Sequence, residues 1–88
     1  MAHHKQALKR HRQNLKRRAR NRHNRASART WVKRARLALA EGDTAQAAPA
    51  VRLAAAKLDR YAAKGAIPKA RAARLKSRLM TQLAKLEG

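Results

Sequence analysis

Hydrophobic positions along this chain recur with helical periodicity and never alternate with polar positions over the length of a strand. Helix-forming residues dominate, Phe is absent and β-branched residues are few, so the pattern predicts an all-α chain. Short segments containing glycine or proline divide it into three helical stretches.

The first predicted helix runs from about Lys5 to Glu41 without a glycine or a proline. Its second half carries a core-facing stripe with i, i+3, i+4, i+7 spacing, formed by Ala28, Trp31, Val32, Ala35, Ala38 and Leu39. Its first half has only a narrow apolar line, formed by Leu8, Leu15, Ala19 and Ala26, with basic residues in almost every other direction. This line is too thin to hold the first half in a core.

The segment EGDTAQ predicts that the first helix ends at Gly42 and that the second begins after Asp43. Asp43 is a suitable N-cap, and Gln46 three residues later completes a capping-box-like pair. The two side chains together are expected to satisfy free amides of the first turn.

The second predicted helix contains Pro49, which is expected to bend or loosen its opening turns because proline has no amide hydrogen. The helix ends at Lys64, where Gly65 supplies a left-handed stop. Its apolar stripe is formed by Ala47, Val51, Ala54, Ala55, Leu58 and either Tyr61 or Ala62.

The third predicted helix follows the segment GAIP, in which the proline favours an extended Ile67 and Pro68 suits the first helical position. Its apolar seam is formed by Ala72, Leu75, Leu79, Leu83 and Leu86. Because short links join antiparallel neighbours, we expect a three-helix antiparallel bundle with a small core rich in Ala and Leu.

The predicted helices differ in length, since about 37 residues extend about 55 Å whereas about 22 residues extend about 33 Å. A long, basic N-terminal helix should therefore overhang the bundle. We divide the chain into a basic arm at residues 1–25 and a three-helix bundle at residues 26–88. Repulsion between like charges should leave the arm partly disordered alone and helical once phosphates neutralise it.

The excess of basic over acidic residues is the strongest indication of function in the sequence. The 88 residues include 24 Lys and Arg against 4 Asp and Glu, a net charge of +20. Residues 1–40 contain 14 of these basic residues and no acid. Self-repulsion on this scale destabilises a compact state unless a polyanion neutralises it, so the sequence predicts an acidic partner.

Most other chemistry is excluded. There is no cysteine, the four acids form no catalytic pair, and no Gly-rich phosphate loop or Ser-His-Asp set occurs, so no enzyme, catalytic residue, cofactor or small-molecule substrate is expected. His3 and His4 are adjacent, with no acid near, and predict no metal site. No apolar run approaches the roughly 20 residues of a membrane span, and the thin apolar line disfavours a helix lying on a membrane surface.

The arm suits folded RNA better than duplex DNA. Arg forks bridge phosphate oxygens, Lys supplies mobile charges, and interspersed Asn and Gln fit sugar hydroxyls and base edges. DNA-binding basic helices precede a long dimerising heptad, which this chain lacks. Trp31 and Tyr61 could stack on bases, but their helical spacing favours core positions.

Three segments resemble the bacterial small-subunit ribosomal protein twenty (S-twenty) family: KRHRQNLKRRARNRHNR, GDTAQA and AAKGAIPKARAARLKSRL. The resemblance covers essentially the whole chain. It implies a three-helix bundle that binds 16S ribosomal RNA directly and early in assembly, near the bottom of the body of the small subunit. It also implies a cytoplasmic, ribosome-bound protein with neighbouring ribosomal proteins as further possible partners.

The resemblance carries RNA-binding roles onto matching positions, and the charge pattern adds others. The family's RNA-facing residues match Lys5, Lys9, Arg10, Arg12, Gln13, Asn14, Arg17, Arg18, Arg20 and Arg22 in the arm, and Lys69, Arg71, Arg74, Lys76 and Arg78 in the third helix. The basic run and its continuation add Lys16, Asn21, Arg25 and Arg29. Within the third helix, Arg71, Arg74 and Arg78 form one row.

The chain departs from the family pattern at three places. Gln6 stands where members commonly have Ser, and Leu15 stands where they have Glu. The segment from Ile67 to Ala70 replaces an Ile-His-Lys-Asn turn, which removes the His and Asn contacts of that turn. The sequence thus predicts a structural ribosomal protein that binds 16S ribosomal RNA, and the alternative is a nucleoid-associated DNA-compacting protein.

Overall fold

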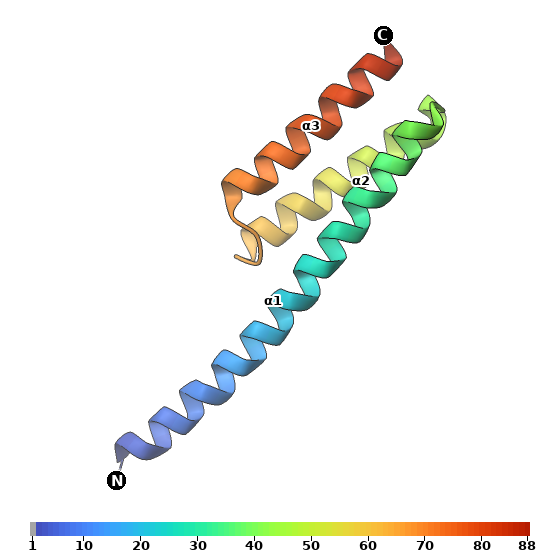
Figure 1. Cartoon of the computed structure of the whole chain (residues 1–88). Coiled ribbons are helices and arrows are strands. Elements are labelled where there is room, and N and C mark those ends of the chain that lie inside the picture. Colours follow the sequence, from blue (N-terminus) through green and yellow to red (C-terminus); the bar gives the residue numbers. More distant parts are fainter. Residues whose placement is uncertain (1) are drawn as a thin grey trace.

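A computed structural model describes residues 2–88, with side chains from Lys5 onward. The described chain consists of α1 (Ala2–Glu41), α2 (Thr44–Ala63) and α3 (Lys69–Glu87), with no strand among these residues. Successive helices run antiparallel, and α2 packs against both of the others, whereas α1 and α3 contact each other less (Figure 1). The predicted all-α class and three-helix arrangement are confirmed.

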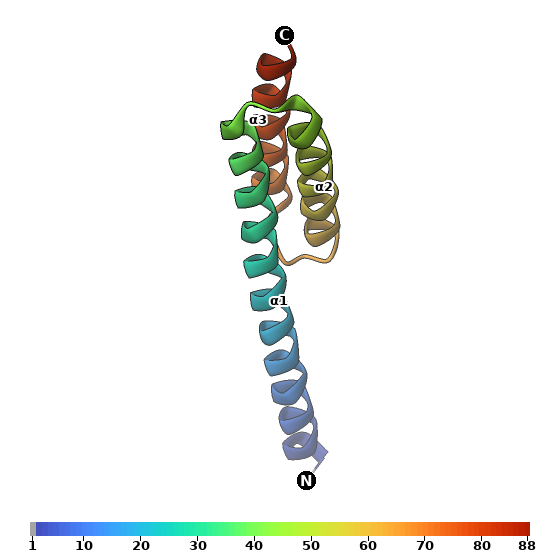
Figure 2. The same cartoon turned by 90° about the vertical axis from the view of Figure 1, so that its right-hand side faces the viewer.

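The long first helix projects far beyond the bundle (Figures 1 and 2). It has 40 residues against 20 in α2, and the molecule measures 66 × 19 × 13 Å along its principal axes. The described side chains of residues 5–20 are all exposed, including Leu8 and Leu15 at 48% and 49%. The predicted overhang is confirmed, while partial disorder of the arm in the free chain stays a prediction, as does a boundary after residue 25.

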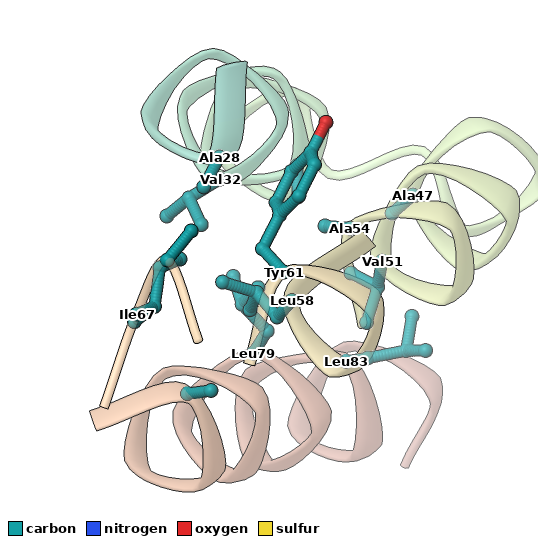
Figure 3. Packing of buried hydrophobic residues seen from close by; sticks show 13 residues of the cluster. Ala28, Val32, Ala47, Val51, Ala54, Leu58, Tyr61, Ile67, Leu79 and Leu83 are labelled. Atoms are coloured by element: carbon teal, nitrogen blue, oxygen red, sulfur yellow. The ribbon is translucent and has the colours of Figure 1, made fainter. Parts of the chain in front are cut away.

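The core lies where the second half of α1 meets α2 and α3 (Figure 3). Val51, Leu58 and Leu79 are its largest fully buried side chains. Every position of the three predicted stripes is buried or packs half-buried against this cluster. The small alanines allow close approach of the helices, and burial of the stripes supplies the main driving force for folding.

The turn between α1 and α2 has the predicted helix end at Gly42 and the predicted N-cap at Asp43, with one correction. Gly42 has φ +76°, which glycine adopts without penalty, and the Asp43 carboxylate accepts a hydrogen bond of 3.0 Å from the amide of Ala45. Among the described side chains that of Gln46 makes no hydrogen bond, so the predicted capping-box pair does not form and the Asp43 carboxylate caps the turn alone. The backbone N–H of Gln46 bonds to the backbone carbonyl of Asp43 at 3.1 Å.

The α2 helix runs unbroken through Pro49 and ends in a Schellman motif. Pro49 is exposed, so the Ala45 carbonyl that loses its amide partner lies on the solvent side. Gly65 has φ +77°, as the sequence predicted, and its amide bonds to the carbonyl of Ala62 at 3.0 Å. The next amide, that of Ala66, bonds to the carbonyl of Tyr61 at 3.0 Å, which completes the motif.

The link into α3 differs from the prediction by one residue. Pro68 is the N-cap of α3 rather than its first helical residue, because its ψ of 137° is extended and its carbonyl accepts the first helical bond, from Ala72 at 3.0 Å. Ile67 was predicted only to be extended, yet it is 7% exposed and belongs to the core. The turn thus closes the end of the bundle from which the arm departs (Figures 1 and 2).

Candidate nucleic-acid interface

The arm forms a rod that is charged on all sides. Ten Lys and Arg lie between residues 5 and 25, a length of about 32 Å at 1.5 Å per residue. The predicted RNA ligands of this part that are exposed are Lys5, Lys9, Arg10, Arg12, Gln13, Asn14, Lys16, Arg17, Arg18, Arg20, Arg22 and Arg25. One cation for about every 3 Å compares with one phosphate for about every 1.7 Å of duplex axis, so the rod can neutralise a substantial share of the phosphates beside it.

The rod has no internal neutralisation. The only ion pair within the described chain joins the Nζ of Lys76 to Oδ2 of Asp59 at 2.9 Å, and neither residue is in α1. Because no acid occurs before Glu41, every arm cation remains available to a polyanion. The exposed rings of His11 and His23 lie among these cations.

The asparagines at the junction of arm and bundle behave differently from the exposed arm residues. Asn24 is 9% exposed and continues the core face of α1. Asn21 is half-buried, and its side-chain oxygen is buried without a hydrogen-bond partner. The guanidinium of Arg25 donates to the backbone carbonyl of Asn21 at 3.4 Å. Burial of Asn24 could not be read from the sequence, because an amide side chain gives no hydrophobic signal.

The predicted α3 residues divide between two sides of that helix. Lys69 and Lys76 line the side next to α2, where Lys76 pairs with Asp59. Arg71 lines the other side, toward α1, and the exposed Arg74 and Arg78 continue the row that starts at Arg71. The two groups therefore cannot face one flat surface together.

Arg71 and the second half of α1 enclose a groove of about 370 Å³. Its cationic rim consists of Arg25, Arg29, Lys33, Arg36 and Arg71. Its apolar lining consists of Ala28, Val32, Leu58, Ile67, Pro68 and Leu75. The structure thus brings together three predicted RNA ligands, Arg25, Arg29 and Arg71. It also adds Lys33 and Arg36, which sequence reasoning missed although they continue the basic face of α1.

The aromatic residues are engaged within the bundle. Trp31 packs half-buried against the core, with the guanidinium of Arg34 at 4.9 Å and the Nζ of Lys57 at 5.4 Å from its ring centroid. These distances are within the range of cation–π attraction. Tyr61 is 7% exposed and packs in the core (Figure 3). Its hydroxyl is 2.8 Å from the Oγ of Ser27. The predicted core position is therefore confirmed for Tyr61, which is buried, whereas Trp31 lies at the edge of the core and is only half-buried.

Other kinds of site find no support in the part of the chain that is described. No group of three or more His, Cys, Asp or Glu residues there could hold a metal ion; the side chains of His3 and His4 lie outside it. Nor does any of the three helices combine the length and apolarity that crossing a membrane requires.

The sequence matches the family model for ribosomal protein S20 over residues 2–84. The chain belongs to this ribosomal protein family. A small ribosomal subunit protein bS20 from Tolumonas auensis is 44% identical over 87 residues, which are 99% of this chain and 100% of the relative. The protein of that name from Sorangium cellulosum is 49% identical over 85 residues, 97% of this chain and 89% of the relative.

A shorter stretch is more similar still. The bS20 protein of Thermomicrobium roseum is 55% identical over 53 residues, 60% of this chain and 54% of the relative. Since these family members are structural ribosomal proteins, the family assignment makes this chain a structural protein and not an enzyme. The resemblance drawn from the arm, the hinge and the third helix is confirmed.

Proposed function

We propose that this S20-family protein binds 16S ribosomal RNA directly as a structural component of the small ribosomal subunit. The observation that carries the proposal is the arm: ten cations over about 32 Å, with no acid and no core contact along residues 5–20. Such a rod has no structural role inside its own fold. The family and the names of its members support the subunit and the ribosomal partner.

The proposed mechanism is neutralisation of crowded phosphates. Because the cations point in all directions around α1, they serve RNA segments on several sides of the rod, which repel one another when the protein is absent. The bundle acts as a rigid head that fixes where the arm begins. The proposal includes all nineteen predicted contact residues, with Asn21 reached at the junction and Lys76 exchanging the Asp59 carboxylate for a phosphate.

The first experiment is a salt titration of the full chain with a 16S 5′-domain fragment, an unrelated folded RNA of equal length and duplex DNA. We expect the 5′-domain fragment to bind at least about a hundredfold more tightly at physiological salt, which corresponds to about 2.7 kcal/mol. Equal affinity for all three nucleic acids, with the same steep dependence of affinity on salt, would instead indicate a polycation without sequence or shape preference. That result would favour the DNA-compacting alternative.

A pair of charge-matched variants tests the arm specifically. The first changes Arg17, Arg18 and Arg20 to Gln, and the second, the α2 variant, changes the exposed cations Arg52 and Arg60 of α2 and its C-cap Lys64 to Gln. Both lose three charges, but only the first loses arm contacts. The slope of log affinity against log salt should fall by about 2 to 3 units in the arm variant and by much less in the α2 variant. Equal losses would refute the proposed neutralisation of phosphates by the arm.

A further inference from the structure

The groove between α1 and α3 combines two surfaces that serve different chemistry. Its rim carries five cations and no acid, four of them arginines. Its floor is formed by aliphatic side chains, among them Val32, Ile67 and Leu75. Phosphates gain from the rim but gain nothing from the floor, because an apolar surface offers an anion no hydrogen bond. The occupant that uses both surfaces has an apolar body and negative charge beside it.

A nucleotide has this construction, with a planar base next to a phosphate. RNA-binding proteins take up bases that are unstacked from loops and bulges, and they hold them against apolar, aromatic or guanidinium surfaces. A cavity of about 370 Å³ lies in the range of small-ligand sites, about 300–1,000 Å³. The arginine forks at the rim match phosphate oxygens in pairs.

The position of the groove favours RNA over an acidic protein segment as the occupant. The floor rests on the Leu58 side chain of α2, which is fully buried. The groove also begins at Arg25, where the arm leaves the bundle. RNA that follows the arm therefore reaches the groove without leaving the cationic surface.

We propose that the groove receives the base of one unpaired nucleotide of the bound RNA. The base lies on the floor of Val32, Ile67 and Leu75, and the neighbouring phosphates lie against Arg25, Arg29 and Arg71. This proposal rests on the proposed RNA-binding function and adds a local preference to it. The arm supplies affinity through charge, whereas the groove distinguishes RNA with an unpaired base from a continuous duplex.

The test uses the full chain and two RNA hairpins of equal length, one fully paired and one with a single bulged 2-aminopurine. At physiological salt the bulged hairpin should bind about tenfold more tightly. Its fluorescence should rise on binding because the base leaves its stacked neighbours for a groove that contains no aromatic side chain. Equal affinity and unchanged fluorescence would overturn the proposal.

Two single substitutions on α3 separate the groove from general charge. Arg71→Gln removes a rim cation, whereas Arg74→Gln removes an exposed cation of the same helix that does not line the groove. Arg71→Gln should abolish most of the tenfold preference, and Arg74→Gln should weaken both hairpins alike. Circular dichroism confirms that both variants fold. Identical behaviour of the two variants would refute a role for the groove.

Methyl NMR spectra identify the occupant directly. The methyl groups of Val32, Ile67 and Leu75 should shift with adenosine monophosphate and not with ribose 5-phosphate. Shifts with both compounds would mean that the rim binds phosphate alone. Shifts only with a pentapeptide of alternating Asp and Leu would mean that the groove binds protein. Either result overturns this proposal, and neither affects the 5′-domain comparison, which tests the RNA-binding function separately.

Discussion

The hydrogen bond between Ser27 and Tyr61 links the part of α1 next to the arm to α2. Its contribution to the free energy of unfolding can be measured by substitution. Among the described residues it is the only side-chain hydrogen bond between α1 and α2, with 2.8 Å between the two hydroxyl oxygens. Tyr61→Phe removes the hydroxyl and keeps the ring, so the buried packing around a side chain of 7% exposure is retained. The substitution therefore removes one hydrogen bond and leaves no cavity in the core.

The expected cost is about 1 kcal/mol, within the range of about 0.5 to 1.5 kcal/mol for a net intramolecular hydrogen bond. Ser27 is half-buried, so water can partly replace the lost partner, which argues against a larger value. For a chain of this size, that cost corresponds to a fall in melting temperature of about 4 to 8 °C. Ser27→Ala should cost a similar amount because it removes the same bond.

A double-mutant cycle is the decisive assay. Unfolding by urea is followed by circular dichroism at 222 nm and by fluorescence of Trp31, the only tryptophan. If the two hydroxyls bond to each other, the double variant should be about 1 kcal/mol more stable than the sum of the single effects predicts. Additivity within about 0.3 kcal/mol, the usual result for independent sites, would refute the bond as a link between arm and bundle.

Three further outcomes follow from the structure. Gly65→Ala should cost about 1 to 2 kcal/mol from its left-handed backbone alone, since φ is +77° and nothing lies within 4 Å of an added Cβ; a stability loss in urea far outside this range would contradict the Schellman geometry. Asp59→Asn should change stability by less than about 1 kcal/mol, because the pair with Lys76 is 39% and 58% exposed; a larger loss would mean that this pair holds α2 to α3. Polyphosphate should raise the helical circular dichroism of the full chain by ordering the arm, and an unchanged spectrum would show that α1 is already fully helical when free.

Local rules explain why so much of the fold was predictable. Helical periodicity, the Asp43 cap and the Gly65 stop all depend on residues within four or five positions of one another. The arm was equally predictable, because ten cations without an acid need no tertiary information to predict a polyanionic partner. Two local details differed from the prediction: the Gln46 side chain adds no cap beside that of Asp43, and Pro68 precedes the first helical residue because its ψ of 137° is extended.

The candidate site was predictable only as a set of residues. The sequence by itself determined three amphipathic helices, a basic overhanging arm and the class of partner, because these follow from composition and from contacts of one helical turn. Only the tertiary structure decided that Lys76 faces Asp59, that Asn24 is buried, and that Arg71 joins Arg25 and Arg29 around one apolar groove. These outcomes depend on how each helix is rotated against its neighbours, and that rotation is set by packing between residues far apart in the chain.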